Sequence, residues 1–246
     1  DNLVCEGQTL FFNAATSGSV NYYWTGPDGF YSTLQNPTLL NASMNVAGNY
    51  SLVASSQECE SVPSSVSVSV SAVNLSVTSI PNMVCLGNSA TLVAQSSANS
   101  YTWNTGANSS VIVVSPSITT IYSVSVTNTA NCMAAKQITV SLISPSISAT
   151  GAVICGTSGT VSLSVQAFTP SLISWYSSQS SSVSVSIGSS TSLNVSSDTT
   201  LYAEATHTLS GCSSVRIPVS VTISALPVIS VSANPTVVCP GKALHL

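Results

Sequence analysis

Three copies of one residue pattern follow one another along this chain, and that repetition constrains the fold more than any other feature. Each copy opens with a cysteine in a short turn that contains glycine and leads into a strand-like segment. A tryptophan stands 18 to 20 residues after this cysteine, and a tyrosine follows behind a later turn. A second cysteine closes the copy 9 or 10 residues past the tyrosine. Self-similarity of this kind is the signature of a repeat architecture, so we expect tandem copies of one domain.

The repeated positions also set the expected domain boundaries. They are, in chain order, Cys5, Trp24, Tyr50 and Cys59; Cys85, Trp103, Tyr122 and Cys132; and Cys155, Trp175, Tyr202 and Cys212. A seventh cysteine, Cys239, opens one more turn of this type before a short alternating segment. We therefore predict domains over 1–72, 73–145 and 146–226, the first with part of its first strand missing. Residues 227–246 are expected to begin a fourth domain of a longer array.

Alternation of apolar and small polar residues predicts that these domains are built from β-strands. The stretch SVSVSVS at 65–71 has the two-residue period of a half-buried strand. Apolar residues make up 44% of the chain, but only 4% are charged, against about 25% in an ordinary soluble protein. No apolar run approaches the roughly 18 residues that a membrane-spanning helix needs. We expect an all-β protein without membrane insertion, whose outward faces carry hydroxyl and amide groups.

The order of the repeated residues favours tandem immunoglobulin-like β-sandwich domains. A tryptophan on an early strand and a tyrosine at the corner before a late strand are typical of that sandwich. Trp24, Trp103 and Trp175 are predicted to fill the centres of the three cores. The tyrosines Tyr50, Tyr122 and Tyr202 are predicted to lie at the corner between the fifth and sixth strands.

Two longer segments carry a resemblance to a known family. VCEGQTL…YYWTGPDGFYS…AGNYSL…C and CLGNSATL…YTWNTG…TTIYSVSV…C resemble the Ig-like and PKD-like tandem repeats of giant bacterial cell-surface proteins. Such repeats occur in gliding-motility-associated adhesins and other cargo of type IX secretion. The resemblance covers the whole chain, although the third copy departs from it in its Cys-Gly-Thr turn and its Ser-rich middle, 177–192. It implies an extracellular, cell-surface protein, and it implies no particular ligand.

The same resemblance bears on glycosylation. Asp198-Thr199-Thr200 is similar to the short Asp-Thr motif that this bacterial group uses for O-glycosylation. It implies Thr199 as an attachment site for a sugar.

Regularly spaced cysteines without CxxC pairs favour disulfides in an oxidising compartment over a zinc site. Two pairings stay open. Pairing within each copy would join Cys5 with Cys59, Cys85 with Cys132 and Cys155 with Cys212. The two cysteines of one sandwich, however, are expected at opposite ends of strands roughly 25 Å long, whereas a disulfide needs Cα atoms about 4.4 to 6.8 Å apart.

Pairing between neighbouring copies would join Cys5 with Cys132 and Cys85 with Cys212. Cys59, Cys155 and Cys239 would then bond to further copies.

Charge and chemistry exclude several classes of function. The net charge is −4, and Lys136, Arg216 and Lys242 are the three basic residues, too few for a nucleic-acid groove. The acidic residues form no pair placed for catalysis and no cluster that would hold calcium. His207 is expected at a strand edge or on an outward face, in a structural role. We predict no catalytic, cofactor or metal site.

Three functions remain. A structural or adhesive array, forming a cell-surface stalk or filament, fits the repetition, the short joins and the cysteines best. One alternative is a set of spacer domains in a secreted multidomain enzyme. The other is a fibre subunit that polymerises by strand exchange, and the nearly charge-free strand edges favour it. The expected partners are neighbouring repeats of the same long chain, with lateral self-association or surface glycans as further candidates.

Overall fold

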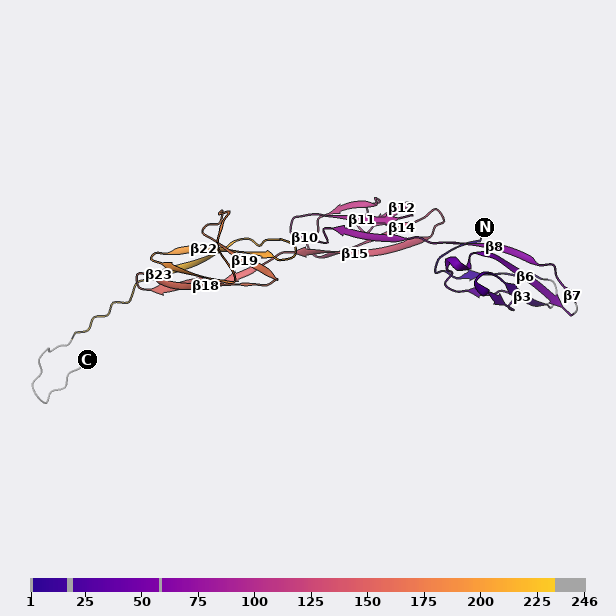
Figure 1. Ribbon diagram of the computed structural model, residues 1–246, viewed down its shortest axis with the longest axis horizontal. Helices are drawn as coiled ribbons and strands as arrows, with labels where there is room; N and C mark the ends of the chain where they lie inside the picture. The colour runs from indigo at the N-terminus through magenta and orange to yellow at the C-terminus, as the bar shows by residue number, and fades with distance from the viewer. Residues whose placement is uncertain (1, 17–19, 58, 233–246) are drawn as a thin grey trace, which may run out of the picture. The chain divides into compact units, whose positions relative to one another are not determined.

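The computed structural model describes residues 2–16, 20–57 and 59–232, which fold almost entirely into β-strands (Figure 1). The helical segments among these residues are two 3-10 turns, Pro27–Gly29 and Met44–Val46. The chain divides into two compact units, Asp1–Leu142 and Ile143–Leu246. The first unit holds two sandwiches, here called the first and second repeats, and the second unit holds the third repeat. Cys239 and most of the predicted fourth domain lie outside the described residues.

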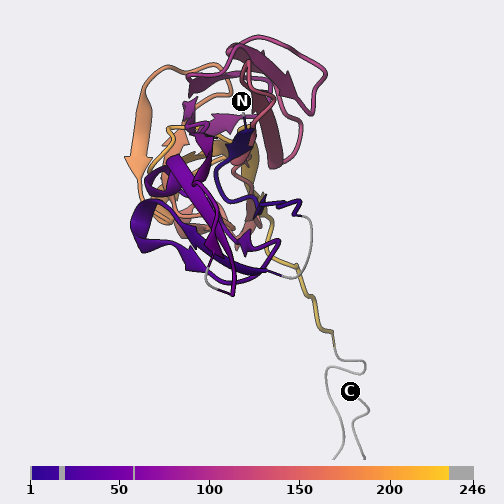
Figure 2. The same cartoon turned by 90° about the vertical axis from the view of Figure 1, so that its right-hand side faces the viewer.

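The first repeat is a sandwich of one large and one small sheet, and Figure 2 turns it, in indigo and purple, toward the viewer. The large sheet has the order β1-β8-β6-β3-β4, with β7 paired to β6, and the small sheet contains β2 and β5. The strands are β1 Asn2–Cys5, β2 Leu10–Phe11, β3 Asn21–Thr25, β4 Tyr31–Ser32, β5 Thr38–Leu39, β6 Gly48–Ser56, β7 Cys59–Glu60 and β8 Ser64–Ser71.

The second repeat has two complete sheets. Their orders are β10-β15-β14-β12 and β13-β11-β9. The strands are β9 Leu75–Ile80, β10 Met83–Cys85, β11 Ala90–Ser96, β12 Ser100–Trp103, β13 Val111–Val114, β14 Thr120–Thr127 and β15 Met133–Ile143. The first strand of the sandwich is therefore split, because β9 pairs in one sheet and β10 in the other.

The third repeat has the same plan with one added strand. Its sheets have the orders β17-β23-β22-β19-β20 and β16-β18-β21. The strands are β16 Ile147–Ala149, β17 Ala152–Cys155, β18 Gly159–Ala167, β19 Ser171–Tyr176, β20 Ser184–Ile187, β21 Ser190–Val195, β22 Thr199–His207 and β23 Ile217–Ser224. Here too the first strand is split, and β17 runs parallel to the last strand, β23. The predicted all-β class and the tandem sandwich architecture are confirmed.

A tryptophan is buried at the centre of each repeat. Trp24, Trp103 and Trp175 are 4%, 2% and 0% exposed. A buried indole N–H normally finds an acceptor, and Trp103 and Trp175 donate to the carbonyl oxygens of Ser109 and Gly188 at 2.8 and 2.9 Å. The indole nitrogen of Trp24 has no hydrogen-bond partner. The two acceptor carbonyls each lie two residues before a strand, β13 or β21.

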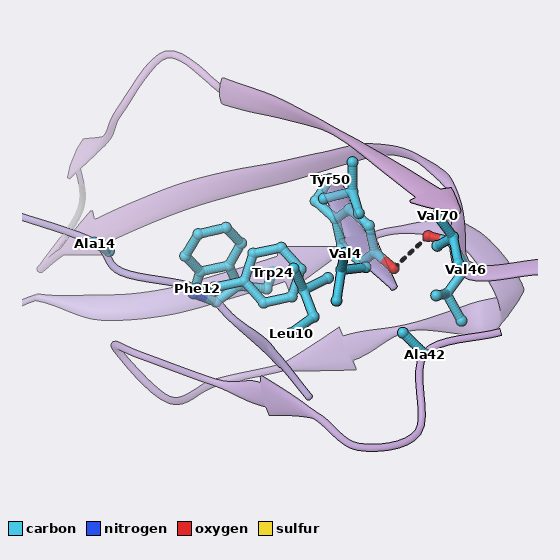
Figure 3. Packing of buried hydrophobic residues seen from close by; sticks show 10 residues of the cluster. Val4, Leu10, Phe12, Ala14, Trp24, Ala42, Val46, Tyr50 and Val70 are labelled. Atoms are coloured by element: carbon cyan, nitrogen blue, oxygen red, sulfur yellow. Dashed lines mark hydrogen bonds between the residues drawn. The ribbon is translucent and has the colours of Figure 1, made fainter. Parts of the chain in front are cut away.

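Aromatic rings fill the core of the first repeat (Figure 3). The ring of Phe12 lies 5.2 Å from that of Trp24 and 4.6 Å from that of Tyr50, centroid to centroid. Tyr50 is completely buried, and its hydroxyl donates a hydrogen bond to the carbonyl oxygen of Val46 at 2.8 Å. This bond ties the start of β6 to the turn before it.

The corner tyrosine is not buried in every repeat. Tyr122 is buried like Tyr50, but Tyr202 is only half-buried and does not belong to the core cluster of the third repeat. The prediction of Tyr202 as a core residue is therefore wrong. In β22 the inward positions are Ala203 and Ala205, both fully buried. Because successive side chains of a strand point to opposite faces, Tyr202 lies on the other face.

His207 also differs from its prediction. It lies at the end of β22 on the inward face and is 7% exposed. Its Nδ1 atom lies 2.9 Å from the hydroxyl oxygen of Ser210. Of the two predicted placements, the outward face is wrong. The side chain closes the core at the β22–β23 loop.

Candidate functional site

A disulfide bond joins the first repeat to the second. It links Cys5 and Cys132, whose Cα atoms are 5.4 Å apart, within the range of about 4.4 to 6.8 Å that such bonds allow. Cys5 is the last residue of β1, and Cys132 lies in the loop between β14 and β15. The sequence left two disulfide patterns open, within repeats and between neighbouring repeats. For Cys5 and Cys132 the structure has the bond between neighbouring repeats.

Cys5 is positioned by the last strand of the first repeat. It pairs with Ser71 in the parallel β1–β8 ladder, and the backbone N–H of Glu6 donates to the carbonyl oxygen of Ser71 at 2.9 Å. The chain then turns at Gly7, whose φ of 81° is a conformation that glycine adopts at little cost. Cys5 is thereby fixed at the end of the sandwich, where the chain leaves β8 for the second repeat.

Cys132 is positioned by a tight loop built around Asn128. The side-chain oxygen of Asn128 accepts hydrogen bonds from the backbone N–H groups of Ala130 and Cys132, each at 2.9 Å. Asn131, directly before the cysteine, has a φ of 59°, a conformation that asparagine adopts more readily than most residues. Cys132 is 2% exposed, so its side chain is buried in this loop.

A hydrogen bond across the same junction lies beside the disulfide. The side-chain amide of Asn128 donates to the hydroxyl oxygen of Ser71 at 2.9 Å. Ser71 is also the residue that pairs with Cys5. One covalent and one polar contact therefore connect the two repeats at the end of β8. We call this group of four residues, Cys5, Ser71, Asn128 and Cys132, the junction site.

The third repeat has cysteines at the positions equivalent to both Cys5 and Cys132. Cys155 ends β17 opposite Ser224, and the N–H of Gly156 donates to the Ser224 carbonyl oxygen at 2.9 Å, as Glu6 does to Ser71. The second cysteine, Cys212, is 2% exposed and follows a residue of positive φ, Gly211. Among the described residues, Cys59 and Cys155 are exposed free thiols, while Cys85 and Cys212 are each disulfide-bonded.

Asn128 and Ser71 are functional residues that reasoning from the sequence did not find. A usable signal was present in the residue before the second cysteine. Asn131 and Gly211 occupy that position in two copies, and both residue types tolerate the left-handed conformation that the loop requires. The hydroxyl of Ser71 carried no signal, because serine is abundant on every outward face of this chain.

The remaining candidates do not form a reactive site. In the described part of the chain, no group of three or more His, Cys, Asp or Glu residues could hold a metal ion. No helix of the described residues is long and apolar enough to cross a membrane. Thr199 begins β22, and its hydroxyl donates to the Ser197 carbonyl oxygen at 2.9 Å. Glycosylation of Thr199 stays a prediction.

Comparison with known proteins supports the immunoglobulin-like assignment. Residues 143–224, the third repeat, match the family model described as Ig-like domain, CHU_C associated. The match confirms the resemblance to Ig-like repeats that the sequence showed. No curated protein matches the chain in sequence.

Among solved structures, the chain is similar to other tandem arrays of domains. The three N-terminal domains of the bacteriophage RB49 highly immunogenic outer capsid protein (Hoc) are 14% identical with a TM-score of 0.43; the alignment covers 91% of this chain and 96% of that one. An I-band fragment from titin is 13% identical with a TM-score of 0.33, covering 92% of this chain and 95% of the other.

Proposed function

We propose that this chain is part of an extracellular, load-bearing array of Ig-like repeats that forms a stalk or filament at the cell surface. The observation that carries the proposal is the Cys5–Cys132 disulfide, because it joins two domains that are already joined by the backbone. A bond of that kind adds little to the function of a free-standing domain, but it limits how far two neighbours separate under tension. Disulfides also form and persist mainly in oxidising, extracellular surroundings.

The repetition of the junction extends the proposal along the chain. Cys155 occupies the same place at the end of β17 as Cys5 does at the end of β1. We therefore expect Cys155 to form a disulfide bond with the second cysteine of a following repeat. We also expect Cys85 to form a disulfide bond with Cys212. The partners of the chain are then neighbouring repeats. Its hydroxyl-rich surface, with a net charge of −4, offers little repulsion against lateral association.

Pulling on single molecules tests this function. The chain is held at its two ends in a Cys85→Ser/Cys212→Ser background, so that the Cys5–Cys132 bond alone is measured. Because the bond bridges a sequence separation of 127, reduction lengthens the fully extended chain by about 420 to 460 Å.

A Cys132→Ser variant in the same background is the matched control. It has the longer extension with or without reductant. An oxidised chain that already reaches the full length of its backbone would show that the disulfide does not carry the load, and the proposal would be withdrawn.

A further inference from the structure

Two of the loops that carry a second cysteine are closed in the same way. In the second repeat the backbone N–H of Asn128 donates to the carbonyl oxygen of Cys132 at 3.0 Å, and in the third the N–H of His207 donates to that of Cys212 at 2.8 Å. We call residues 207–212 the Cys212 loop. His207 occupies in it the place that Asn128 has in the second repeat, although the Cys212 loop is one residue longer.

The residue before each cysteine supports this equivalence. Asn131 and Gly211 both have a positive φ, 59° and 71°. The N–H of Asn131 donates to the carbonyl oxygen of Asn128 at 3.1 Å, and that of Gly211 donates to the carbonyl oxygen of His207 at 3.0 Å. The backbones of the two loops therefore follow one plan, so their side chains can be compared by position.

One side chain fixes the loop of the second repeat, whereas two side chains share this task in the third. Asn128 Oδ1 accepts the backbone N–H groups of Ala130 and of the cysteine itself. In the third repeat His207 Nδ1 accepts the N–H of Ser210 at 3.2 Å, and Ser210 Oγ accepts the N–H of Cys212 at 3.3 Å. The serine thus bridges the extra residue of the longer loop.

The burial of His207 makes these hydrogen bonds necessary. It is 7% exposed, and the other buried residues in the described part of the chain are apolar, aromatic or cysteine. Burying a polar ring costs free energy unless its hydrogen-bonding groups find partners. Both contacts of His207 Nδ1 are with Ser210, so they offset this cost while the Cys212 loop keeps its shape.

We propose that His207 is a positioning residue, which through Ser210 holds the backbone at Cys212 in the conformation in which this cysteine forms its disulfide. Cys212 is disulfide-bonded and 2% exposed. A loop that is ordered before the bond forms loses less conformational freedom on bonding, which raises the effective concentration of the thiol. The inference rests on the proposed function, because it names residues that prepare a further junction of the array.

Redox equilibrium against dithiothreitol measures this effect on the full chain. The protein disulfide is reduced to two thiols while dithiothreitol is oxidised to its cyclic disulfide, so electrons and protons balance. Alkylation of the free thiols and peptide mapping report the bonds of Cys212 and Cys132 separately in one sample. Cys59, Cys155 and Cys239 are replaced by serine throughout, so that exchange with these thiols cannot interfere.

Three variants distinguish hydrogen bonding from the filling of space. His207→Leu fills the buried position without an acceptor, and Ser210→Ala removes the bridging hydroxyl. His207→Asn places an acceptor, Oδ1, at the same number of bonds from Cα as Nδ1. Loss of one or two hydrogen bonds should lower the equilibrium constant for forming the Cys212 bond about 5- to 30-fold in the first two variants. His207→Asn should retain a higher constant than His207→Leu.

The internal control is the Cys5–Cys132 bond, which should keep its wild-type equilibrium constant in every variant. Ser213→Ala is the matched control in the neighbouring position, because its hydroxyl lies 3.0 Å from that of Thr206. It should leave the Cys212 bond unchanged. The proposal is overturned if His207→Leu equals wild type or if His207→Asn falls as low as His207→Leu. Equal weakening by Ser213→Ala and Ser210→Ala would also overturn it.

The same peptide map keeps this inference separate from the proposed function. It identifies the cysteine to which Cys212 is bonded, and a partner other than Cys85 would correct the pairing expected above. The comparison among the variants of His207 would still decide whether this side chain positions Cys212, because it depends on the strength of the bond and not on the identity of the partner.

Discussion

Tyr50 shows how one side chain determines a turn of the first repeat. Its ring packs against Gly26, where a Cβ atom would lie 2.3 Å from the ring carbon Cδ1, so only glycine fits opposite it. Its hydroxyl is bonded to Val46 in the interior. Burial, and in second place the negative charge of Asp28, raise the pKa of Tyr50 above its ordinary value of 10.0. The fold thus favours the neutral phenol.

The raised pKa predicts a loss of stability in alkali. An unfolded tyrosine ionises near pH 10, whereas the folded phenol holds its proton to higher pH. The stabilisation is therefore complete below about pH 10 and is lost as the pH rises through the folded pKa. Tyr50→Phe should lower the free energy of unfolding by about 1 to 3 kcal/mol at pH 7, because the Val46 carbonyl loses its donor. The deficit relative to wild type should shrink above pH 10.

Urea unfolding at a series of pH values measures this dependence. Tyr31→Phe is the matched control, because Tyr31 is 62% exposed. Loss of its hydroxyl should change neither the free energy of unfolding at pH 7 nor the dependence of that free energy on pH. If wild type and Tyr50→Phe lose stability in parallel above pH 10, the ionisation of another group is responsible.

Single residues also mark how far the sequence alone could predict the structure. Trp24, Trp103 and Trp175 were predictable because a large apolar ring at a nearly constant distance from the first cysteine has few places outside a core. The sequence could not place Tyr202, since a shift of one residue along a strand exchanges its two faces. The contact of Asn128 with Ser71 joins residues 57 positions apart, and no local pattern carries such information.

At the scale of elements, Arg216 holds a loop that has no apolar anchor. Its Nη1 atom donates to the carbonyl oxygens of Gln179 and Ser181 at 2.9 and 2.7 Å, and its Nε atom donates to Glu204 Oε2 at 2.6 Å. The guanidinium carbon lies 3.4 Å from the centre of the Tyr176 ring. The hydrogen bond to Glu204 is the main cause of the raised pKa of Arg216, so the group stays charged.

The geometry of this contact predicts that lysine cannot replace Arg216. A single ammonium group cannot donate to Glu204 and to both loop carbonyls while stacking on a ring. In Arg216→Lys, amide hydrogen exchange of residues 178–183 should become faster while that of β22 stays slow. Lys136→Arg, an equal exchange of cations on an exposed strand position, is the control and should leave the loop unchanged. Equal protection of 178–183 in wild type and Arg216→Lys would refute the role given to the guanidinium group.

The alternation of apolar and polar residues predicts the strands, but it does not predict which sheet each strand joins. The pattern at 65–71 predicts β8, and similar alternation predicts most of the longer strands. The split of the first strand into β9 and β10, however, depends on pairing with β11 on one side and β15 on the other. Because these partners lie in different sheets, the switch is a tertiary property. It also places Cys85 and Cys155 at the end of their sandwiches.

For the molecule as a whole, the question is which contact keeps neighbouring repeats in place. Three residues connect β8 to β9, and the junction site adds one disulfide and the bond from Asn128 to Ser71. A partly exposed hydrogen bond contributes about 1 kcal/mol, which thermal motion overcomes readily. The covalent bond cannot open thermally, so it determines the range of angles between the first two repeats.

Removing this bond should therefore broaden the distances between the two repeats. Fluorescent labels on unnatural amino acids at Ser67 and Gln137, both exposed, report the distance by single-molecule energy transfer. Wild type should give one narrow distribution, and Cys132→Ser a broader one, since the hydrogen bond and the short join alone permit bending. Cys59→Ser removes a free, exposed thiol and should keep the narrow distribution. A narrow distribution in Cys132→Ser would mean that noncovalent packing, and not the disulfide, fixes the junction.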